Sequence, residues 1–209
     1  MTQQDTKLRV LGRYTSSNVQ KVLWCLGELR QPFQREDYGG PFGRTNDPEY
    51  LRFNPNGTVP TLVDGNLVIW ESNTIVRYLC NKFPKSPLYP ADAVQRALAE
   101  RWMDWQLGSV AVQFLPLYRG LVREQRRAEE LEAARQRTAS LLAVLDAALA
   151  QREYLNGPEL TVADIALGPT VYRWYELPIS RESMPNLQGW YERLSHRPAF
   201  RDSVMVGLH

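Results

Sequence analysis

Three polar residues, Ser16, Ser17 and Asn18, lie where a predicted strand gives way to a predicted helix. The apolar run over residues 8–11 predicts the strand, and apolar side chains at helical spacing over residues 19–29 predict the helix. The first amides of a helix have no partner within it, and they point outward with the positive end of the helix dipole. This position favours a bound anion, and a thiolate is one such anion.

The same residues also suit an ordinary helix start. Serine and asparagine are preferred at the N-cap position, and Ser17 followed by Gln20 fits a capping box. On this stretch alone, capping explains the residues without any bound anion.

The overall composition is that of a globular protein without a strong charge bias. The 209 residues are 44% hydrophobic, and 25 basic against 23 acidic residues leave a net charge of +2. This balance predicts neither a nucleic-acid partner nor a membrane-surface partner, and the basic run over residues 123–127 is interpreted as a solvated helix face. Residues 1–7 lack the apolar core of a signal peptide, and no stretch reaches the roughly 20 apolar residues of a membrane span.

Cysteine and histidine are scarce. Cys25 and Cys80 lie inside predicted amphipathic helices and outside any C-x-x-C or metal-ligand spacing. His196 and His209 are the only histidines, so a zinc site is not expected. These features predict a cytoplasmic protein without a disulfide framework and without a metal.

The first ninety residues alternate strand and helix signals, which implies a small mixed sheet flanked by helices. Strands are expected at 8–11, 33–38, 59–63 and 67–70, the last two as a hairpin around the Asp64-Gly65-Asn66 turn. Strand signals vanish after the proline-rich residues 84–90. Helical patterns follow over 91–125, 126–152, 160–175, 186–195 and 198–205, the first interrupted at Gly108 and kinked at Pro116.

These motifs together resemble those of the cytosolic glutathione S-transferases, in the bacterial branch that shares an active serine with phi and theta enzymes. The resemblance covers nearly the whole chain, and it is carried by residues 16–19, 54–62, 70–79 and 160–166. It implies an α/β N-terminal domain of thioredoxin-like fold, with a mixed four-stranded sheet and flanking helices, and an all-α C-terminal helical bundle. The expected boundaries are 1–84 for the first domain, 85–91 for a linker and 92–209 for the second domain.

The resemblance also implies a glutathione site on the first domain. The family's Val-Pro bond is cis, and Val59-Pro60 matches it, so the Val59 main chain would pair with the cysteinyl backbone of glutathione. Ser72 and Glu71 would hold the carboxylate and the ammonium of the glutamyl end. The glycyl carboxylate has a weaker candidate in Arg44. The implied glutathione-binding residues are Asn18, Thr58, Val59, Pro60, Glu71, Ser72 and Arg44.

Two residues are candidates for the active serine, depending on which family pattern is aligned. In the phi-like pattern the serine lies five residues before a basic residue, which selects Ser16 before Lys21. The theta-like pattern places it four residues before, which selects Ser17. The Asn18-Val19 pair two residues after Ser16 favours Ser16, with Ser17 as the alternative.

The implied activity is attack of the glutathione thiolate on a small electrophile, by halide displacement or by addition to an activated double bond, in detoxification. The electrophile should lie between the domains. Aromatic residues are the candidates for its walls, namely Phe42, Phe114, Tyr118, Tyr172 and Trp174. A homodimer is also implied, in which Arg77 and Tyr78 contact residues 91–107 of the second subunit.

Two rival functions use the same fold. A glutathione-dependent peroxidase or thiol oxidoreductase usually has a cysteine at the strand–helix junction, where this chain has Ser16 and Ser17, and Cys25 lies too far along the helix. A non-catalytic assembly or regulatory protein need not retain Glu71 and Ser72. Thr161 and Asp164 match the family's structural capping box and are assigned to folding.

Overall fold

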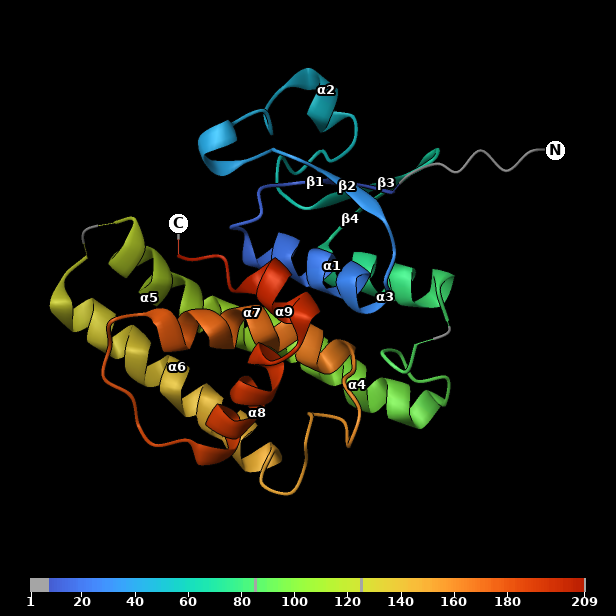
Figure 1. The fold of residues 1–209 in the computed structure, drawn as a ribbon. Coiled ribbons are helices and arrows are strands. Elements are labelled where there is room, and N and C mark those ends of the chain that lie inside the picture. The colour runs from blue at the N-terminus through green and yellow to red at the C-terminus, as the bar shows by residue number, and fades with distance from the viewer. Residues whose placement is uncertain (1–7, 85, 125, 209) are drawn as a thin grey trace.

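The computed structural model describes residues 8–84, 86–124 and 126–208, and Figure 1 shows a sheet layer above a larger helical layer. The expectations for residues 1–7, for position 85 of the linker and for the helix boundary at 125 lie outside these described residues. The fold class is confirmed, as an α/β part with a four-stranded mixed sheet followed by an all-helical part. The domain boundaries stay a prediction.

The sheet has the strand order β2-β1-β3-β4. Its strands are β1 (Leu8–Leu11), β2 (Phe33–Glu36), β3 (Thr61–Asp64) and β4 (Leu67–Trp70). β1 pairs in parallel with β2 and antiparallel with β3, and β3 and β4 form the predicted hairpin. The helices of this part are α1 (Ser17–Glu28), the 3-10 turn η1 (Gly40–Phe42), α2 (Pro48–Leu51) and α3 (Ser72–Lys82).

The helical layer begins with a helix that changes its winding. The predicted helix over residues 91–125 is α4 (Ala93–Trp105), a π-helical segment η2 (Gln106–Val110) and α5 (Ala111–Val122). The interruption at Gly108 is therefore confirmed, and it consists of one widened turn of the kind that recurs at functional sites. Pro116 lies inside α5, which continues to Val122.

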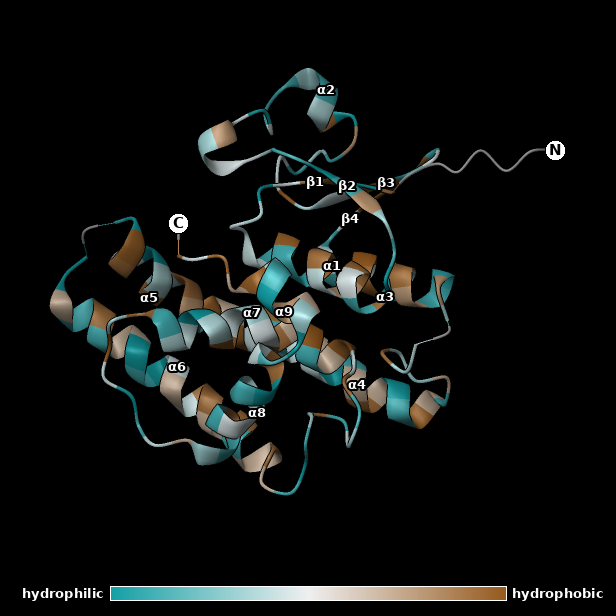
Figure 2. Cartoon of the chain, viewed as in Figure 1, coloured by the Kyte–Doolittle hydropathy of each residue, from teal (hydrophilic) through white to brown (hydrophobic). Residues whose placement is uncertain are grey.

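The remaining helices bury one face or are surrounded completely. They are α6 (Ala128–Ala148), α7 (Val162–Glu176), α8 (Pro185–Ser195) and α9 (Pro198–Val204). Figure 2 shows hydrophilic and hydrophobic residues alternating along α4 and α6, as expected for helices with one exposed face. All of residues 162–174 in α7 are buried, so this helix is the centre of the helical layer.

The sheet layer and the helical layer share one core, and α1 lies at its centre. All of residues 19–26 of α1 are buried. The ring of Trp24 packs edge-on against Phe200 of α9 with 4.7 Å between centroids. A Cβ atom added at Gly168 of α7 would lie 2.5 Å from the Trp24 ring, so α7 can approach α1 this closely only with glycine there. This packing fixes α1 against the helical layer.

The capping box before α7 is confirmed. The Asp164 carboxylate accepts hydrogen bonds from the Thr161 amide at 2.9 Å, the Leu155 amide at 3.0 Å and the Trp190 indole at 2.8 Å. The Thr161 hydroxyl in turn accepts from the Ala163 amide at 3.4 Å. The carboxylate thereby joins three segments of the helical layer, which agrees with the predicted structural role.

Candidate active site

The start of α1 presents a serine hydroxyl with no partner in the described chain. Ser16 is the N-cap residue, with φ −85° and ψ 124°, and its side chain makes no capping hydrogen bond. The first backbone hydrogen bond of the helix is donated by the Gln20 amide to the Ser16 carbonyl at 2.8 Å, so the amides of residues 17–19 precede it and face the helix end. The Ser16 hydroxyl and these amides are therefore hydrogen-bond donors at the same end of the helix.

The capping box expected from Ser17 and Gln20 is wrong. The helix begins at Ser17 itself, one residue earlier than a Ser17 N-cap requires. The amide side chain of Gln20 instead donates to the carbonyl of Val204 at 3.4 Å, because α9 packs against this face of α1. Plain capping therefore does not account for either serine.

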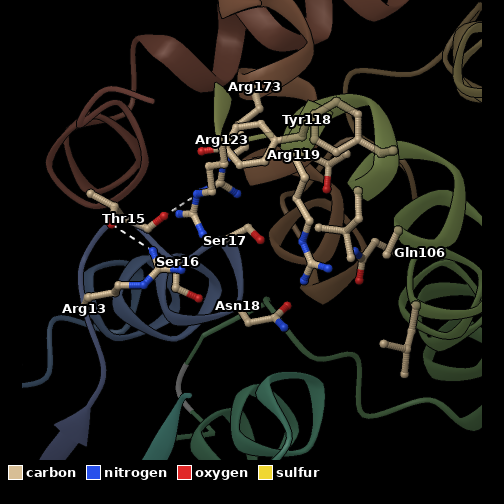
Figure 3. A pocket seen from close by; sticks show the side chains of 15 residues that line it. Arg13, Thr15, Ser16, Ser17, Asn18, Gln106, Tyr118, Arg119, Arg123 and Arg173 are labelled. Carbon is tan, nitrogen blue, oxygen red and sulfur yellow. Dashed lines mark hydrogen bonds between the residues drawn. The ribbon is translucent and has the colours of Figure 1, made fainter. Parts of the chain in front are cut away.

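A cavity of about 220 Å³ opens beside these serines, between the start of α1 and helices α5 and α7 of the helical layer (Figure 3). Of the predicted site residues, it brings together Ser16, Ser17, Asn18, Phe114 and Tyr118. Its wall also includes Gln106 of η2, the widened turn. The cavity is thus formed by both layers, where a second substrate was expected.

The other three aromatic candidates do not line this cavity. Phe42 is 42% exposed on η1, and Trp174 is 1% exposed in the core. The Tyr172 hydroxyl accepts a hydrogen bond from the Gly207 amide at 3.0 Å, which turns it toward the C-terminal segment. Of the four aromatic candidates on α5 and α7, two line the cavity and two do not.

Four arginines line the cavity, and sequence reasoning missed all of them as site residues. They are Arg13, Arg119, Arg123 and Arg173. The only local signal was the four-residue spacing of Arg119, in the last turn of α5, and Arg123, the C-cap residue of that helix. Arg123, assigned with residues 124–127 to a solvated face, belongs to the cavity wall although it is exposed.

Arg173 is held rigidly at the back of the cavity. It is 4% exposed, its Nη2 donates to the Thr15 carbonyl at 2.8 Å, and its guanidinium lies 5.1 Å from the centre of the Tyr118 ring. Arg13 donates to the Thr15 hydroxyl at 2.9 Å, so both arginines converge on the residue that precedes Ser16 (Figure 3). Burial lowers the pKa of Arg173 and, with help from the nearby Arg123 charge, that of Arg13.

The loop before β3 carries the cis bond that the resemblance implies, between Val59 and Pro60. The Tyr50 hydroxyl and the Asn54 amide donate to the Thr58 carbonyl at 2.6 and 2.8 Å, which fixes the loop. Across residues 8–84, 86–124 and 126–208, the N–H and C=O of Val59 have no hydrogen-bond partner. Val59 is therefore available to pair with an added extended peptide.

Glu71 and Ser72 form the start of α3. Glu71 is the N-cap residue and has φ +71°, a left-handed conformation that is unusual for a residue other than glycine. Ser72 is the buried first residue of the helix, while the Glu71 side chain is exposed. Backbone strain of this kind concentrates at functional positions, where the surroundings enforce it.

Arg44 has a partner in its own chain, Tyr38. Its Nη2 donates to the Tyr38 hydroxyl at 2.9 Å, and its guanidinium stacks on that ring at 4.1 Å. The side chain is exposed. Its role toward a glycyl carboxylate stays a prediction.

Two further findings concern metal sites and membrane-spanning helices among the described residues. No set of three or more His, Cys, Asp or Glu side chains is arranged there to hold a metal ion. Among the same residues, no helix has both the length and the apolar character needed to cross a membrane.

Comparisons with known proteins agree with this geometry. The sequence matches the glutathione S-transferase N-terminal domain over residues 15–82 and the C-terminal domain over residues 107–198. It is 40% identical to glutathione S-transferase GstB of Escherichia coli strain K12 over 200 residues, which cover 93% of this chain and 96% of that protein. Glutathione S-transferase 3 of Zea mays is 31% identical over 207 residues, covering 94% and 93% of the two chains.

The fold has a similarly close counterpart among solved structures. The theta class glutathione S-transferase of Xanthomonas axonopodis pv. citri, solved with glutathione bound, is 45% identical with a TM-score of 0.94, covering 98% of this chain and 100% of that chain. Both domains and their order thus have matches along nearly the whole chain. The protein belongs to the glutathione S-transferase family and is a glutathione transferase.

Proposed function

We propose that the protein joins the thiolate of glutathione to small electrophilic carbon atoms, with the Ser16 hydroxyl as the hydrogen-bond donor to that thiolate. The observation that carries this assignment is the unpartnered Ser16 hydroxyl at the start of α1, beside a cavity between the two layers. The amides of residues 17–19 and the helix dipole add positive potential at the same place.

The chemistry needs a stabilised thiolate more than it needs a base. Free glutathione is mostly a thiol at neutral pH, and the thiolate is the attacking form. A hydrogen bond to a charged group contributes roughly 1.5–3 kcal/mol, which lowers a thiol pKa by about one to two units. The sulfur then forms a bond to carbon, and a halide leaves with its electron pair or a double bond accepts the pair.

Ser16 is favoured over Ser17 by its place in the helix. An N-cap residue has extended backbone angles, so its side chain leaves the helix axis at the end where the free amides point. Ser17 is the first helical residue, and its own amide is one of those donors. Both serines line the cavity, so Ser17 stays the alternative.

Glutathione would lie along the edge of the first layer that leads to Ser16. The N–H and C=O of Val59 would pair with its cysteinyl backbone, and Ser72 and Glu71 would hold its glutamyl end at the start of α3. Asn18, Thr58, Pro60 and Arg44 are the further proposed contacts. The strained φ of Glu71 and the unpaired main chain of Val59 support this placement.

Two measurements test the proposal. The protein should be retained on immobilised glutathione and released by free glutathione, and it should accelerate thioether formation between glutathione and an aryl halide. Retention without acceleration would favour a binding or assembly role. Reduction of a glutathione mixed disulfide without any thioether formation would favour the oxidoreductase alternative.

We also propose a cytoplasmic homodimer that acts in detoxification. Arg77 and Tyr78 were the candidates for the dimer contact, and both have partners in their own chain. Arg77 pairs with Glu100 at 2.7 Å and Asp104 at 3.0 Å, and Tyr78 donates to Asp64 at 2.6 Å. These bonds orient the two side chains on α3, and a dimer contact would add to them. Sedimentation at micromolar concentration should show twice the 24.1 kDa mass of the chain, and a species of single mass would contradict the dimer.

A further inference from the structure

The peptide unit that joins Thr15 to Ser16 is hydrogen-bonded at both of its polar groups. Its N–H, which belongs to Ser16, donates to the Arg13 carbonyl at 3.2 Å. Its C=O, which belongs to Thr15, accepts from Nη2 of Arg173 at 2.8 Å. Because a peptide unit is planar, bonds on both of its sides hold the whole plane in one orientation.

The peptide unit that follows Ser16 is held as well. The Ser16 carbonyl accepts the first backbone hydrogen bond of α1 from the Gln20 amide at 2.8 Å. Two fixed planes on either side of one Cα atom determine its φ and ψ, which are −85° and 124° at Ser16. They also determine the direction of the Cα–Cβ bond, and the hydroxyl can then occupy only the staggered positions around that bond.

The bond from Arg173 comes from the helical layer, whereas the other two are local to the start of α1. Arg173 lies on α7, is 4% exposed, and has its guanidinium 5.1 Å from the centre of the Tyr118 ring of α5. Both helices contribute to the cavity wall. The main chain at Ser16 is therefore oriented relative to the cavity and not only relative to its own layer.

A second arginine holds Thr15 through its side chain. Nη1 of Arg13 donates to the Thr15 hydroxyl at 2.9 Å, and Thr15 is 8% exposed. Figure 3 shows the side chains of Arg13 and Arg173 close to Thr15, which directly precedes Ser16. One arginine thus binds the main chain of Thr15 and the other binds its hydroxyl.

Stability alone does not account for an arginine at position 173. Within residues 8–84, 86–124 and 126–208, Arg173 forms no ion pair, and its hydrogen bond is to a neutral carbonyl. A buried cation without a carboxylate partner lowers the stability of the fold. Apolar side chains of similar volume often replace buried charged groups without any loss of stability.

We propose that Arg173, together with Arg13, is a positioning residue for the thiolate donor: by holding Thr15, the two arginines direct the Ser16 hydroxyl at the glutathione sulfur. The inference rests on the proposed function, in which Ser16 donates to the thiolate. A hydrogen bond weakens steeply when its donor turns away from the acceptor. Loss of the Thr15 contacts would let the peptide unit before Ser16 rotate, so the bond to sulfur would weaken although the hydroxyl remains.

A different role for Arg173 would be to stabilise the thiolate by its charge. Arg173 lines the same cavity as Ser16, and a positive charge there would act on the sulfur whether or not the hydroxyl is present. A double-mutant cycle with Ser16→Ala separates the two roles. A residue that acts through the serine loses its effect once the hydroxyl is gone, whereas a charge that acts on the sulfur keeps its effect.

The main experiment measures Arg173→Met with glutathione and an aryl halide, in the wild-type background and in the Ser16→Ala background. In the first, kcat should fall about ten- to hundredfold, because a misplacement of about 1 Å costs about hundredfold. The pKa of the bound thiol, read from the pH dependence of kcat, should rise by about one unit, while the KM for glutathione stays nearly unchanged. In the Ser16→Ala background the same exchange should lower kcat by about threefold or less.

Thr15→Val tests the other contact without changing any charge. Valine is β-branched like threonine and lacks the hydroxyl that accepts from Arg13. We expect kcat to fall about three- to tenfold, the loss of one hydrogen bond, and to fall only where Ser16 is present. Because Thr15→Val leaves Arg173 in the core, it decides the question if Arg173→Met does not fold.

Arg181→Met is the matched control for a purely structural effect. Arg181 also donates to main-chain carbonyls, those of Trp174 at 2.9 Å and Tyr175 at 2.7 Å, near the end of α7. It does not line the cavity. The exchange should lower the free energy of unfolding, while kcat and the thiol pKa stay at their wild-type values.

The outcomes distinguish this inference from the proposed function. Equal falls of kcat in both backgrounds would assign Arg173 to charge or to general structure, and would overturn the inference while the transferase chemistry stays in place. Wild-type kcat and thiol pKa in folded Arg173→Met, or in Thr15→Val, would overturn it as well. If Ser16→Ala itself leaves kcat and the thiol pKa unchanged, the assignment of Ser16 fails, and the inference fails with it.

Discussion

The Nζ atom of Lys21 lies 2.6 Å from Oε1 of Gln106, and this buried bond joins α1 to the π-helical turn η2. Lys21 is 1% exposed, and its Nζ lies 3.4 Å from Oδ1 of Asn73 on α3. Asn73 in turn donates to the Met103 carbonyl of α4 at 2.9 Å. Because Gln106 lines the cavity, this chain of bonds fixes one wall of the site to the helix that carries Ser16.

The charge of Lys21 makes stability depend on pH. Burial lowers the pKa of Lys21 to about 7 against the opposing effect of Glu71, while the unfolded value is 10.5. Between these values the unfolded chain binds more protons than the folded one, so the free energy of unfolding rises with pH. Below pH 7 Lys21 is charged in the folded protein as well, so burial of its charge lowers the free energy of unfolding by the full amount. We expect Lys21 to add about 2 kcal/mol of stability from pH 7 to pH 9.

Urea unfolding of the wild type and of Lys21→Met at pH 7, 8 and 9 measures this contribution. The difference between the two proteins should widen with pH in favour of the wild type. Lys21→Gln keeps a polar group near Gln106, and it replaces Lys21→Met in this measurement if the methionine variant folds poorly. Parallel curves for wild type and variants would show that Lys21 does not titrate in this range.

Exchange of each serine for alanine separates the two possible donors to the thiolate. Ser16→Ala should lower turnover by about 10²–10³, because one oriented donor to an anion is lost. The pKa seen in the pH dependence of kcat/KM should rise by about one to two units. Ser17→Ala should change both quantities little. The reverse pattern would assign the role to Ser17.

The same two variants also test the corrected start of α1. Neither serine makes a side-chain cap in the described structure, so the free energy of unfolding of both variants should lie within about 0.5 kcal/mol of the wild-type value. A loss near 1 kcal/mol in Ser17→Ala would indicate the capping box that the structure does not contain. Thermal unfolding of the two variants decides this point.

Glu71→Gln should weaken glutathione binding without slowing the chemistry. The side chain would contact the glutamyl ammonium, which is remote from the sulfur and is bound equally in ground and transition states. The KM for glutathione should rise about tenfold while kcat is retained. Gln keeps the side-chain length at the left-handed φ of +71°, so the backbone strain is matched. A fall in kcat with an unchanged KM would contradict this role.

Local patterns allowed the elements to be predicted. The hairpin of β3 and β4 follows from two apolar runs around one glycine turn, which are neighbours in the sequence. The capping box of Thr161 and Asp164 and the cis bond at Val59 and Pro60 came instead from the resemblance to a family.

The charge of the cavity could not be predicted in this way. Arg13 and Arg173 are 160 positions apart, and they meet at Thr15 only because α7 packs against α1. The same tertiary packing diverts Gln20 to the carbonyl of Val204 and away from a capping box. It also separates Phe114, which lines the cavity, from Trp174, which lies in the core.

The two cysteines should be inert in the folded protein. Cys25 and Cys80 are both buried, and their sulfur atoms lie 3.7 Å apart between α1 and α3. The hydrogen bond with Cys80, together with burial, raises the pKa of Cys25 well above its usual value, so Cys25 forms little thiolate. A disulfide-exchange reagent at pH 8 should react rapidly with no thiol of the native protein and with two thiols after denaturation. Rapid native reaction would show that this interface between α1 and α3 opens.

Asp164→Ala should be the most destabilising of these substitutions. The carboxylate is 0% exposed and accepts from the Thr161 amide, the Leu155 amide and the Trp190 indole, which would all lose their acceptor. Each buried donor left unsatisfied costs about 1–3 kcal/mol, and we expect a total loss of about 3–5 kcal/mol after relaxation.

Thr161→Ala provides the matched control for Asp164→Ala. It removes one capping hydroxyl and leaves the carboxylate in place, so the loss should be about 1 kcal/mol. Chemical denaturation of both variants measures the two values under the same conditions. The glutathione KM of the folded Asp164→Ala protein should stay near that of the wild type, because Asp164 lies in the helical layer and does not line the cavity. Equal small losses in both variants would mean that water replaces the carboxylate, and Asp164 would then not hold the three segments together.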